Sequence, residues 1–324
     1  MEDYKKIRYT KLTFVIEFEE ETELVREKVS AIRGGIGEML LRANCIANRQ
    51  CESCGFRDEC IVQRTMYSRF EKLPESVHAG DSVGYTLCCA DRRKEFAAGD
   101  RLEFTLTLFG RTIVYFSQYL NAVYALGQNG LGSHGSRFRV LSVRNLYGQP
   151  VLEGRNVYME RYRWETLGEY VAHRRAKLLQ ACEQAEPGNR EPFAGSLVFE
   201  TPLCLKYQGQ FQQSFAGEAL SAGVLRRLWI LSCFENAIGE EGGGYRLFQP
   251  PEQPALTVAS GWARQKEISR YSSRHGQNIM LKGIVGKAEL TDISEKWLDL
   301  LLAGEVTQIG KNTSFGFGKY HLEW

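Results

Sequence analysis

The two halves of this 324-residue sequence show the same order of strand and helix patterns, and this repeat most constrains the fold. Runs of β-branched and aromatic residues predict strands, and apolar residues three or four positions apart predict helices. The first half is predicted to contain a strand at 12–18, a helix at 24–40, strands at 83–88 and 102–108, a helix at 113–126 and a strand at 138–143. The second half is predicted to contain a strand at 197–207, a helix at 216–238, strands at 256–259 and 279–290, a helix at 294–302 and a final strand.

Each half therefore has the order β-α-β-β-α-β. This order predicts an α+β fold of two tandem ferredoxin-like (RRM-like) domains, and the chain is long enough for two cores. We expect an N-terminal domain at 1–148 with an inserted cysteine cluster, a basic and aromatic connector at 149–195, and a C-terminal domain at 196–324. Each domain has a glycine-rich loop before its last strand, and Gly34-Gly35 is expected to break or kink the first helix.

The second of these loops, IGKNTSFGFGKY at 309–320, combines three glycines with two lysines, an asparagine and two hydroxyls. Glycine lets a backbone approach closely and turn its N–H groups toward an anion, so a phosphate is a natural ligand. The same pattern also fits a tight turn before a closing strand. A Walker loop is excluded because Gly304 and Gly310 are one residue too far apart and Asn312 follows Lys311. The interpretation kept is a loop suited to a nucleic-acid backbone.

Charge is informative only locally, because 41 Lys and Arg against 39 Asp and Glu leave a net charge of +2. Residues 264–287 are the basic cluster. This range contains one acidic residue, Glu267, and six basic residues, so its net charge is +5. The basic residues are Arg264, Lys266, Arg270, Arg274, Lys282 and Lys287. The connector interleaves arginines with tyrosines and a tryptophan, a mixture that suits base stacking and equally a solvated helix.

Four of the nine cysteines are bunched as C-x5-C-x2-C-x5-C: Cys45, Cys51, Cys54 and Cys60. A C-x2-C knuckle with two further thiolates can form a closed structural zinc site. Unligated thiols and an iron–sulfur cluster are the alternatives, because the outer spacings are irregular. The charged N-terminus and the lack of a membrane-length apolar run predict a cytoplasmic protein with no membrane partner.

Several motifs together resemble the CRISPR precursor-RNA processing endoribonucleases of the RAMP superfamily. The most specific is IGKNTSFGFG at 309–318, and the resemblance covers nearly the whole chain. The other motifs are RYSSR at 270–274, LKGIVG at 281–286, IRGGIG at 32–37, YSRFE at 67–71 after the cysteines, GLG at 130–132 and TPL at 201–203.

The resemblance implies binding of CRISPR repeat RNA and one metal-free cut per repeat to release guide RNAs. No cofactor is expected for catalysis; zinc would be structural. RNA contacts are expected in the cleft between the domains. The candidate RNA-binding residues are Arg33, Arg264, Arg270, Ser272, Arg274, Gly310, Lys311, Asn312, Ser314, Gly316 and Lys319.

Metal-free cleavage uses the substrate 2′-OH as nucleophile, so the protein moves protons and neutralises the phosphorane. Histidine suits this role, and His134 and His275 are the candidates, with Tyr271 and Lys282 as alternatives. Related enzymes often place a catalytic histidine in the first helix, where this sequence has none. The competing hypothesis is a non-cleaving RNA-binding subunit of a CRISPR effector complex. Effector or adaptation proteins of CRISPR systems are further candidate partners.

Overall fold

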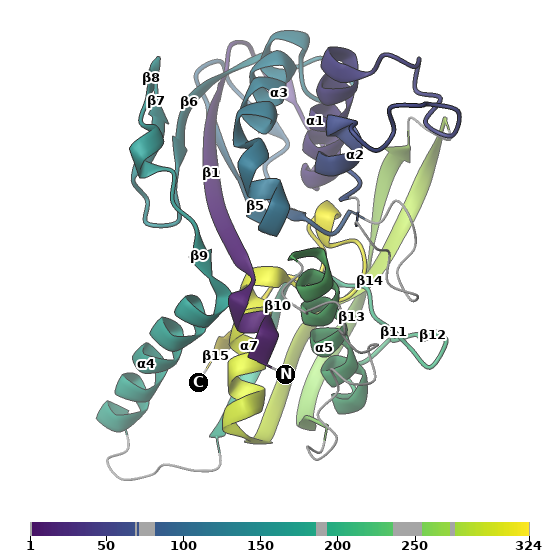
Figure 1. Cartoon of the computed structure of the whole chain (residues 1–324). Helices are drawn as coiled ribbons and strands as arrows, with labels where there is room; N and C mark the ends of the chain where they lie inside the picture. The colour runs from purple at the N-terminus through teal and green to yellow at the C-terminus, as the bar shows by residue number, and fades with distance from the viewer. Residues whose placement is uncertain are drawn as a thin grey trace. The chain divides into compact units, whose positions relative to one another are not determined.

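The computed structural model describes residues 2–68, 70, 82–185, 193–235, 255–272 and 276–323 (Figure 1). They form two compact units, Tyr9–Trp164 and Met1–Arg8 with Glu165–Trp324. Both units are built from antiparallel sheets and helices, so the predicted α+β class is confirmed. The predicted connector, 149–195, is divided between the two units. None of the helices in the described ranges is long and apolar enough to cross a membrane.

The first unit is organised around β1, which pairs with β5 on one side and with β6 on the other. The strand order is β3-β5-β1-β6-β7-β8. Leu12 of β1 lies opposite Leu106 of β5, and Phe14 lies opposite Phe104. The strands are β1 (Arg8–Phe18), β3 (Tyr85–Cys88), β5 (Arg101–Phe109), β6 (Phe138–Arg144), β7 (Pro150–Glu153) and β8 (Asn156–Val157), with β2 (Thr22–Glu23) and β4 (Glu95–Phe96) paired separately.

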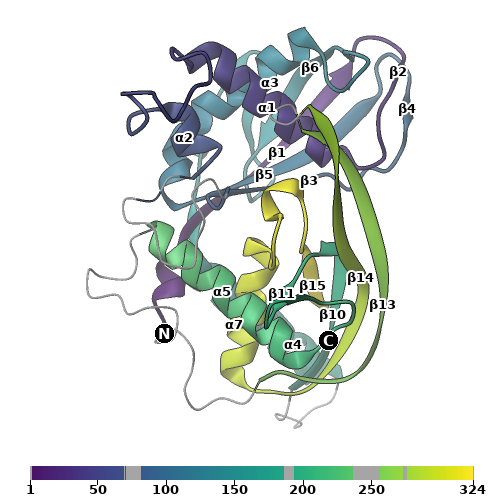
Figure 2. The same ribbon diagram turned by 90° about the vertical axis from the view of Figure 1, so that its right-hand side faces the viewer.

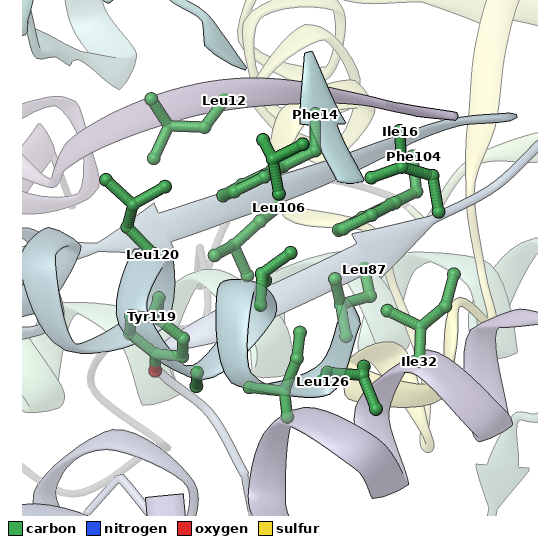
Figure 3. Packing of buried hydrophobic residues seen from close by; sticks show 14 of the residues in the cluster. Leu12, Phe14, Ile16, Ile32, Leu87, Phe104, Leu106, Tyr119, Leu120 and Leu126 are labelled. Carbon is green, nitrogen blue, oxygen red and sulfur yellow. The ribbon is translucent and has the colours of Figure 1, made fainter. Parts of the chain in front are cut away.

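One face of this sheet packs against helices and makes the core of the unit. The Phe14 and Phe104 rings stack with centroids 5.0 Å apart, and leucines of the helices and strands surround them (Figure 3). Tyr119 is fully buried in this core, and its hydroxyl donates to Thr65 O at 2.9 Å. The helices are α1 (Val29–Asn44), α2 (Ile61–Thr65), the 3-10 turn η2 (Gly110–Tyr115), α3 (Phe116–Asn129) and η3 (Met159–Arg161).

Helix α1 differs from the prediction in two ways. It begins at Val29 and not at Leu24. Leu24 is buried, but it lies in an extended segment, and its amide donates to Lys94 O at 2.8 Å. The helix also continues through Gly34-Gly35 without a break. A Cβ on Gly35 would lie 2.5 Å from Leu126 Cδ1 of α3, whereas nothing lies within 4 Å at Gly34. Gly35 therefore allows the close packing of α1 on α3.

The second unit repeats this order. Its sheet runs β13-β14-β10-β15, the same order as β3-β5-β1-β6, as a duplicated β-α-β-β-α-β unit requires. Helices α5 and α7 lie on one side of the sheet (Figure 2). The elements are η1 (Glu2–Lys6), β9 (Glu165–Thr166), α4 (Leu167–Ala185), β10 (Phe193–Leu203), β11 (Lys206–Tyr207), β12 (Gln210–Phe211), α5 (Gly217–Glu235), β13 (Thr257–Ser272), β14 (Gln277–Ile293), α7 (Glu295–Thr307), η4 (Thr313–Phe315) and β15 (Tyr320–Glu323).

Strands β13 and β14 are longer than predicted. They pair continuously to Ser272 and Gln277, whereas β10 accompanies β14 only from Ile284 to Ile293. Residues 266–272 and 277–283 therefore form a two-stranded extension, here called the ribbon (Figure 2). The charged and polar residues at 264–267 lack the apolar alternation of a half-buried strand, which is why the sequence did not predict this part of β13.

Candidate nucleic-acid interface

The glycine loop, residues 308–319, connects α7 to β15 and has an unusual backbone. Five of its residues have positive φ angles: Gln308, Gly310, Asn312, Gly316 and Gly318. At Gly318, where φ is +74°, a Cβ would lie 1.8 Å from Ile309 O. At Gly310, where φ is +81°, it would lie 2.6 Å from Cys204 O. Only glycine fits these two positions, because both the backbone angle and the close approach exclude a side chain.

Most amides of the glycine loop are used to fix its shape. Lys311 N donates to Cys204 O at 2.7 Å and Gly318 N donates to Pro202 O at 2.8 Å. Ile309 N donates to Gly318 O at 3.1 Å, which closes the loop at its base. With its amide nitrogen turned toward the loop, the buried Gln308 side chain donates to Phe317 O and Thr313 O at 2.8 and 3.2 Å. The loop is thus held against the TPL segment, 201–203, and Cys204.

Two cationic side chains are accessible on this loop. Lys311 is exposed, and half-buried Lys319 forms an ion pair with Glu200 at 2.6 Å. Asn312 is half-buried, whereas Ser314 is only 4% exposed and Gly316 is buried. Ser314 and Gly316, predicted to bind RNA, therefore contribute to the shape of the loop, while Lys311 contributes charge at its surface.

The ribbon packs directly against the glycine loop. Ile268 and Leu281 on its inner face form an apolar cluster with Cys204 and Phe317. Next to this cluster, the Arg270 guanidinium lies over the Phe315 ring, 4.5 Å from the centroid. The structure thus brings together two separately predicted groups, the basic cluster and the glycine loop.

The outer face of the ribbon is polar and aromatic. Tyr271 is 67% exposed near the end of β13, and Arg264 is exposed at its base. Lys282 forms an ion pair with Glu267, directly opposite on β13, at 2.7 Å. Of the other predicted residues, Arg274 and His275 lie outside the described residues, as does the side chain of Ser272.

Two predicted residues belong to the first unit. Arg33 is half-buried on α1 and donates to Ser82 Oγ at 3.3 Å. His134 is exposed in the turn between α3 and β6. Neither placement tests a role in RNA binding or catalysis, and both roles stay predictions.

The predicted zinc site is not supported. The four cysteines do line one pocket of about 300 Å³ between α1 and α2, together with apolar side chains such as Ile46 and Phe56. All four thiols are free and half-buried, and Cys45 Sγ accepts a hydrogen bond from Arg49 N at 3.2 Å. Among the described residues, no three Cys, His, Asp or Glu side chains come close enough together to hold a metal ion. The spacing brings the thiols to one pocket without converging them on one point.

The sequence analysis missed a polar network on the sheet face of the second unit opposite α5 and α7. His321 lies at its centre, with Nδ1 3.1 Å from Glu200 Oε1 and Nε2 3.1 Å from Glu323 Oε1. Lys287 forms ion pairs with Glu323 and with Glu289, at 3.4 and 3.2 Å. The period-two spacing of Lys319, His321 and Glu323 was the available signal, because alternate residues of a strand share a face. The partners on β10 and β14 follow only from strand pairing.

These contacts lower the pKa values of two carboxyl groups in the network, those of Glu200 and Glu323. Partial burial acts to raise the pKa of Glu200, but the hydrogen bonds and charges of Lys319 and His321 outweigh it, so the pKa lies below its ordinary value. The hydrogen bond from His321, with the pairing to Lys287, likewise lowers the pKa of Glu323. The network therefore favours ionised carboxylates around the His321 ring.

Comparison with known proteins gives a family match for the C-terminal part of the chain. The model for the CRISPR-associated endoribonuclease Cas6 matches residues 197–320, a range that contains the ribbon and the glycine loop. This part of the chain is of the Cas6 type. The resemblance to CRISPR precursor-RNA processing endoribonucleases of the RAMP superfamily is thereby confirmed. A second family model, AF_1859_N, described as an N-terminal domain, matches residues 7–166.

Whole-chain similarities extend over both units. An uncharacterized protein of Archaeoglobus fulgidus is 23% identical over 296 residues, covering 90% of this chain and 89% of the relative. A Cas6 product complex has a TM-score of 0.50 at 16% identity, covering 97% of this chain and 98% of that chain. A partial Cas6-RT-Cas1–Cas2 complex has a TM-score of 0.57 at 13% identity, covering 98% of this chain. The present chain spans 46% of that longer chain. At such identities the structures show a shared fold.

Proposed function

We propose that this Cas6-type protein binds CRISPR repeat RNA and cleaves the precursor transcript within its repeats, without a metal ion, to give guide RNAs. The observation that carries the proposal is the joint placement of the ribbon and the glycine loop inside the Cas6-family domain. Lys311 is exposed on the loop and Arg270 is fixed beside it. This surface combines shape and positive charge as RNA backbone recognition requires.

RNA binding uses the cations of the ribbon and loop for affinity and position. Arg264, Arg270 and Lys311 neutralise phosphates, and the exposed Tyr271 offers a ring for an unpaired base. Because most loop amides are used within the protein, the loop contributes mainly through its lysine side chains and its fixed shape. Repeat identity is then read from hairpin shape and unpaired bases.

The cleavage step uses the 2′-OH of the nucleotide before the scissile phosphate as nucleophile. The products are a 2′,3′-cyclic phosphate and a 5′-hydroxyl. The protein removes the 2′-OH proton, stabilises the phosphorane and protonates the leaving 5′-oxygen. His134, His275, Tyr271 and Lys282 are the candidates for these roles, and Lys282 forms an ion pair with Glu267 across the ribbon.

Protein partners are proposed from the same comparison. The name of one similar structure places Cas6 in one complex with RT, Cas1 and Cas2. We therefore propose that other CRISPR proteins, adaptation proteins among them, bind this chain. The test is co-purification with Cas1 and Cas2 encoded in the same genome, with a 1 M salt wash separating specific from purely electrostatic association.

The cleavage test uses purified protein and a transcript of the CRISPR repeat from the source genome. Cutting should survive EDTA, yield the two product ends named above and stop when one 2′-deoxy nucleotide precedes the cut. The alternative, a non-cleaving RNA-binding subunit, is favoured by the lack of a histidine in α1, Val29–Asn44. Binding without any cleavage would establish that alternative. Cleavage of the deoxy substrate would refute the mechanism.

A further inference from the structure

The network around His321 joins one histidine, two lysines and three glutamates on one face of the sheet of the second unit. It lies at the end of the glycine loop, since Glu200 N donates to Lys319 O at 3.0 Å and Lys319 N donates to Thr201 Oγ1 at 2.9 Å. Lys319 belongs to the glycine loop, and His321 follows it on the same face of the sheet, about 7 Å further along. A backbone bound at the loop can therefore reach the histidine.

We infer that His321 is the general acid of the proposed ribonuclease, and that Glu200 is the residue that positions it. The inference rests on the proposed cleavage reaction. Glu200 Oε1 lies 3.1 Å from Nδ1 and Glu323 Oε1 lies 3.1 Å from Nε2, so each ring nitrogen has a carboxylate to which it can donate a hydrogen bond. Of the histidines in the described residues, His321 alone has carboxylates at both ring nitrogens; His134 and His173 are exposed side chains.

The two carboxylates have different roles. Glu200 is held by Lys319 and by its own backbone, so it fixes the Nδ1 side of the ring. Glu323 has a second cation, Lys287, at 3.4 Å, so it can leave Nε2 and keep an ion-pair partner. RNA then replaces Glu323 at Nε2. This division makes Nε2 the working nitrogen.

The step balances in protons and electrons. The 2′-oxygen attacks phosphorus and its proton passes to the base or to solvent. The bond between phosphorus and the 5′-oxygen breaks, its electron pair stays on that oxygen, and the proton on His321 Nε2 moves to it. The imidazole is left neutral and regains a proton from water.

The charged groups facing His321 come from three strands. Glu200 is on β10, Glu323 is on β15 and Lys287 is on β14, while Lys319 is the residue directly before β15. Across the sheet, His321 pairs with Val198, which pairs with Lys287, which pairs with Trp262 of β13. Removing Glu200 should therefore release the Nδ1 side of the ring and slow the proton transfer from Nε2.

The experiment compares H321Q, E200Q, H173A and wild type in single-turnover cleavage of the repeat transcript. Glutamine can still donate hydrogen bonds to Glu200 and Glu323 through its side-chain amide, but it cannot act as an acid. H321Q should cut about 10²–10⁴-fold more slowly with unchanged RNA affinity. Wild type should lose activity on the alkaline side and H321Q should lack this decline, whereas E200Q should keep the decline but cut more slowly than wild type. His173→Ala, on the exposed face of α4, is the control and should match wild type.

A 5′-bridging phosphorothiolate substrate distinguishes chemistry from structure, because a sulfur leaving group needs no acid. H321Q should cut this substrate at about the wild-type rate. The inference is overturned if H321Q cuts the normal transcript at the native rate, or is equally slow on both substrates. If wild type cuts neither substrate, the proposed function fails first, and the assignment fails with it.

Discussion

The Arg270 guanidinium lies over the Phe315 ring, 4.5 Å from its centroid, and so connects the ribbon to the glycine loop. A cation held on an aromatic face loses little further freedom when a phosphate binds, because its planar group is already oriented. The pair therefore presents one fixed positive charge beside the loop.

Replacing Arg270 tests this arrangement. Arg270→Ala should weaken binding of the repeat transcript and reduce the slope of log K against log salt by about 0.7–0.9, the value for one lost phosphate contact. Phe315→Leu should leave the slope unchanged and weaken binding less, because a cation–π contact is worth about 0.5–1 kcal/mol at exposed sites. Fluorescence anisotropy at several salt concentrations measures both. An unchanged slope in Arg270→Ala would remove this residue from the interface.

Lys311 makes a separate prediction, because its side chain is exposed while its amide anchors the loop to Cys204 O. Lys311→Ala keeps the anchor and removes only the charge, so affinity and salt slope should both fall while thermal stability stays the same. Lys296→Ala, at an exposed position early in α7, is the matched control. Equal salt dependence in the two variants would show that the loop does not bind phosphate.

The order of the elements was predictable from the sequence because apolar periodicity reports burial, and both units bury one face of each element. The start of α1 was not predictable from the sequence. Leu24 is buried although it lies in an extended segment, and its spacing from the apolar residues of α1 is the spacing expected within a helix. The spacing of the four cysteines likewise indicated that their thiols lie near one another, and they do line one pocket. It could not show whether the four sulfur atoms point at one metal position, and among the described residues they do not.

The His321 network was missed for a different reason. A sequence shows which residues of one strand share a face, but not which strands become neighbours. Glu323 lies two residues after His321 on the same strand, but Glu200 is far away in sequence, and only the pairing of β10 with β15 brings it to the same imidazole. Such a network becomes visible only once the strand order is known.

Gly34 and Gly35 should respond oppositely to alanine, although both lie inside α1. Gly34→Ala should stabilise the protein by about 0.5–1 kcal/mol, because alanine has the higher helix propensity and nothing lies within 4 Å of the new Cβ. Gly35→Ala forces Leu126 of α3 to move, and overpacking typically costs about 1–3 kcal/mol. Urea unfolding of the two variants measures the difference. Equal midpoints would show that α1 and α3 do not pack as described.

The thiols should divide into two classes by reactivity. Cys51 and Cys54 line the open pocket between α1 and α2. Burial raises the pKa of Cys89 and Cys204, and it raises that of Cys233 to about 11. For Cys233 this leaves about 100-fold less thiolate at pH 8 than at an ordinary thiol.

Timed iodoacetamide labelling with mass spectrometry should find Cys51 and Cys54 modified first. Unfolding in guanidinium should remove the difference, which is the control for intrinsic reactivity. Early labelling of Cys204 would contradict its placement beneath the glycine loop.

The carboxyl groups around His321 and Lys319 should make stability depend on acidic pH. The folded protein holds Glu200 and Glu323 ionised below their ordinary pKa of 4.5, so it binds fewer protons there than the unfolded chain does. Their contribution to stability is therefore complete above about pH 4.5 and is lost as the pH falls through the lower pKa values of the folded protein.

Lys319→Ala removes the cation that lies 2.6 Å from Glu200, so it should bring the Glu200 pKa closer to its ordinary value. Urea unfolding of this variant should show a smaller loss of stability between neutral pH and pH 3 than wild type shows. Lys296→Ala should follow the wild-type curve, and 1 M salt should narrow the gap between Lys319→Ala and wild type, because these ion pairs are partly exposed. Identical pH curves for Lys319→Ala and wild type would show that the ion pair between Lys319 and Glu200 does not form in solution.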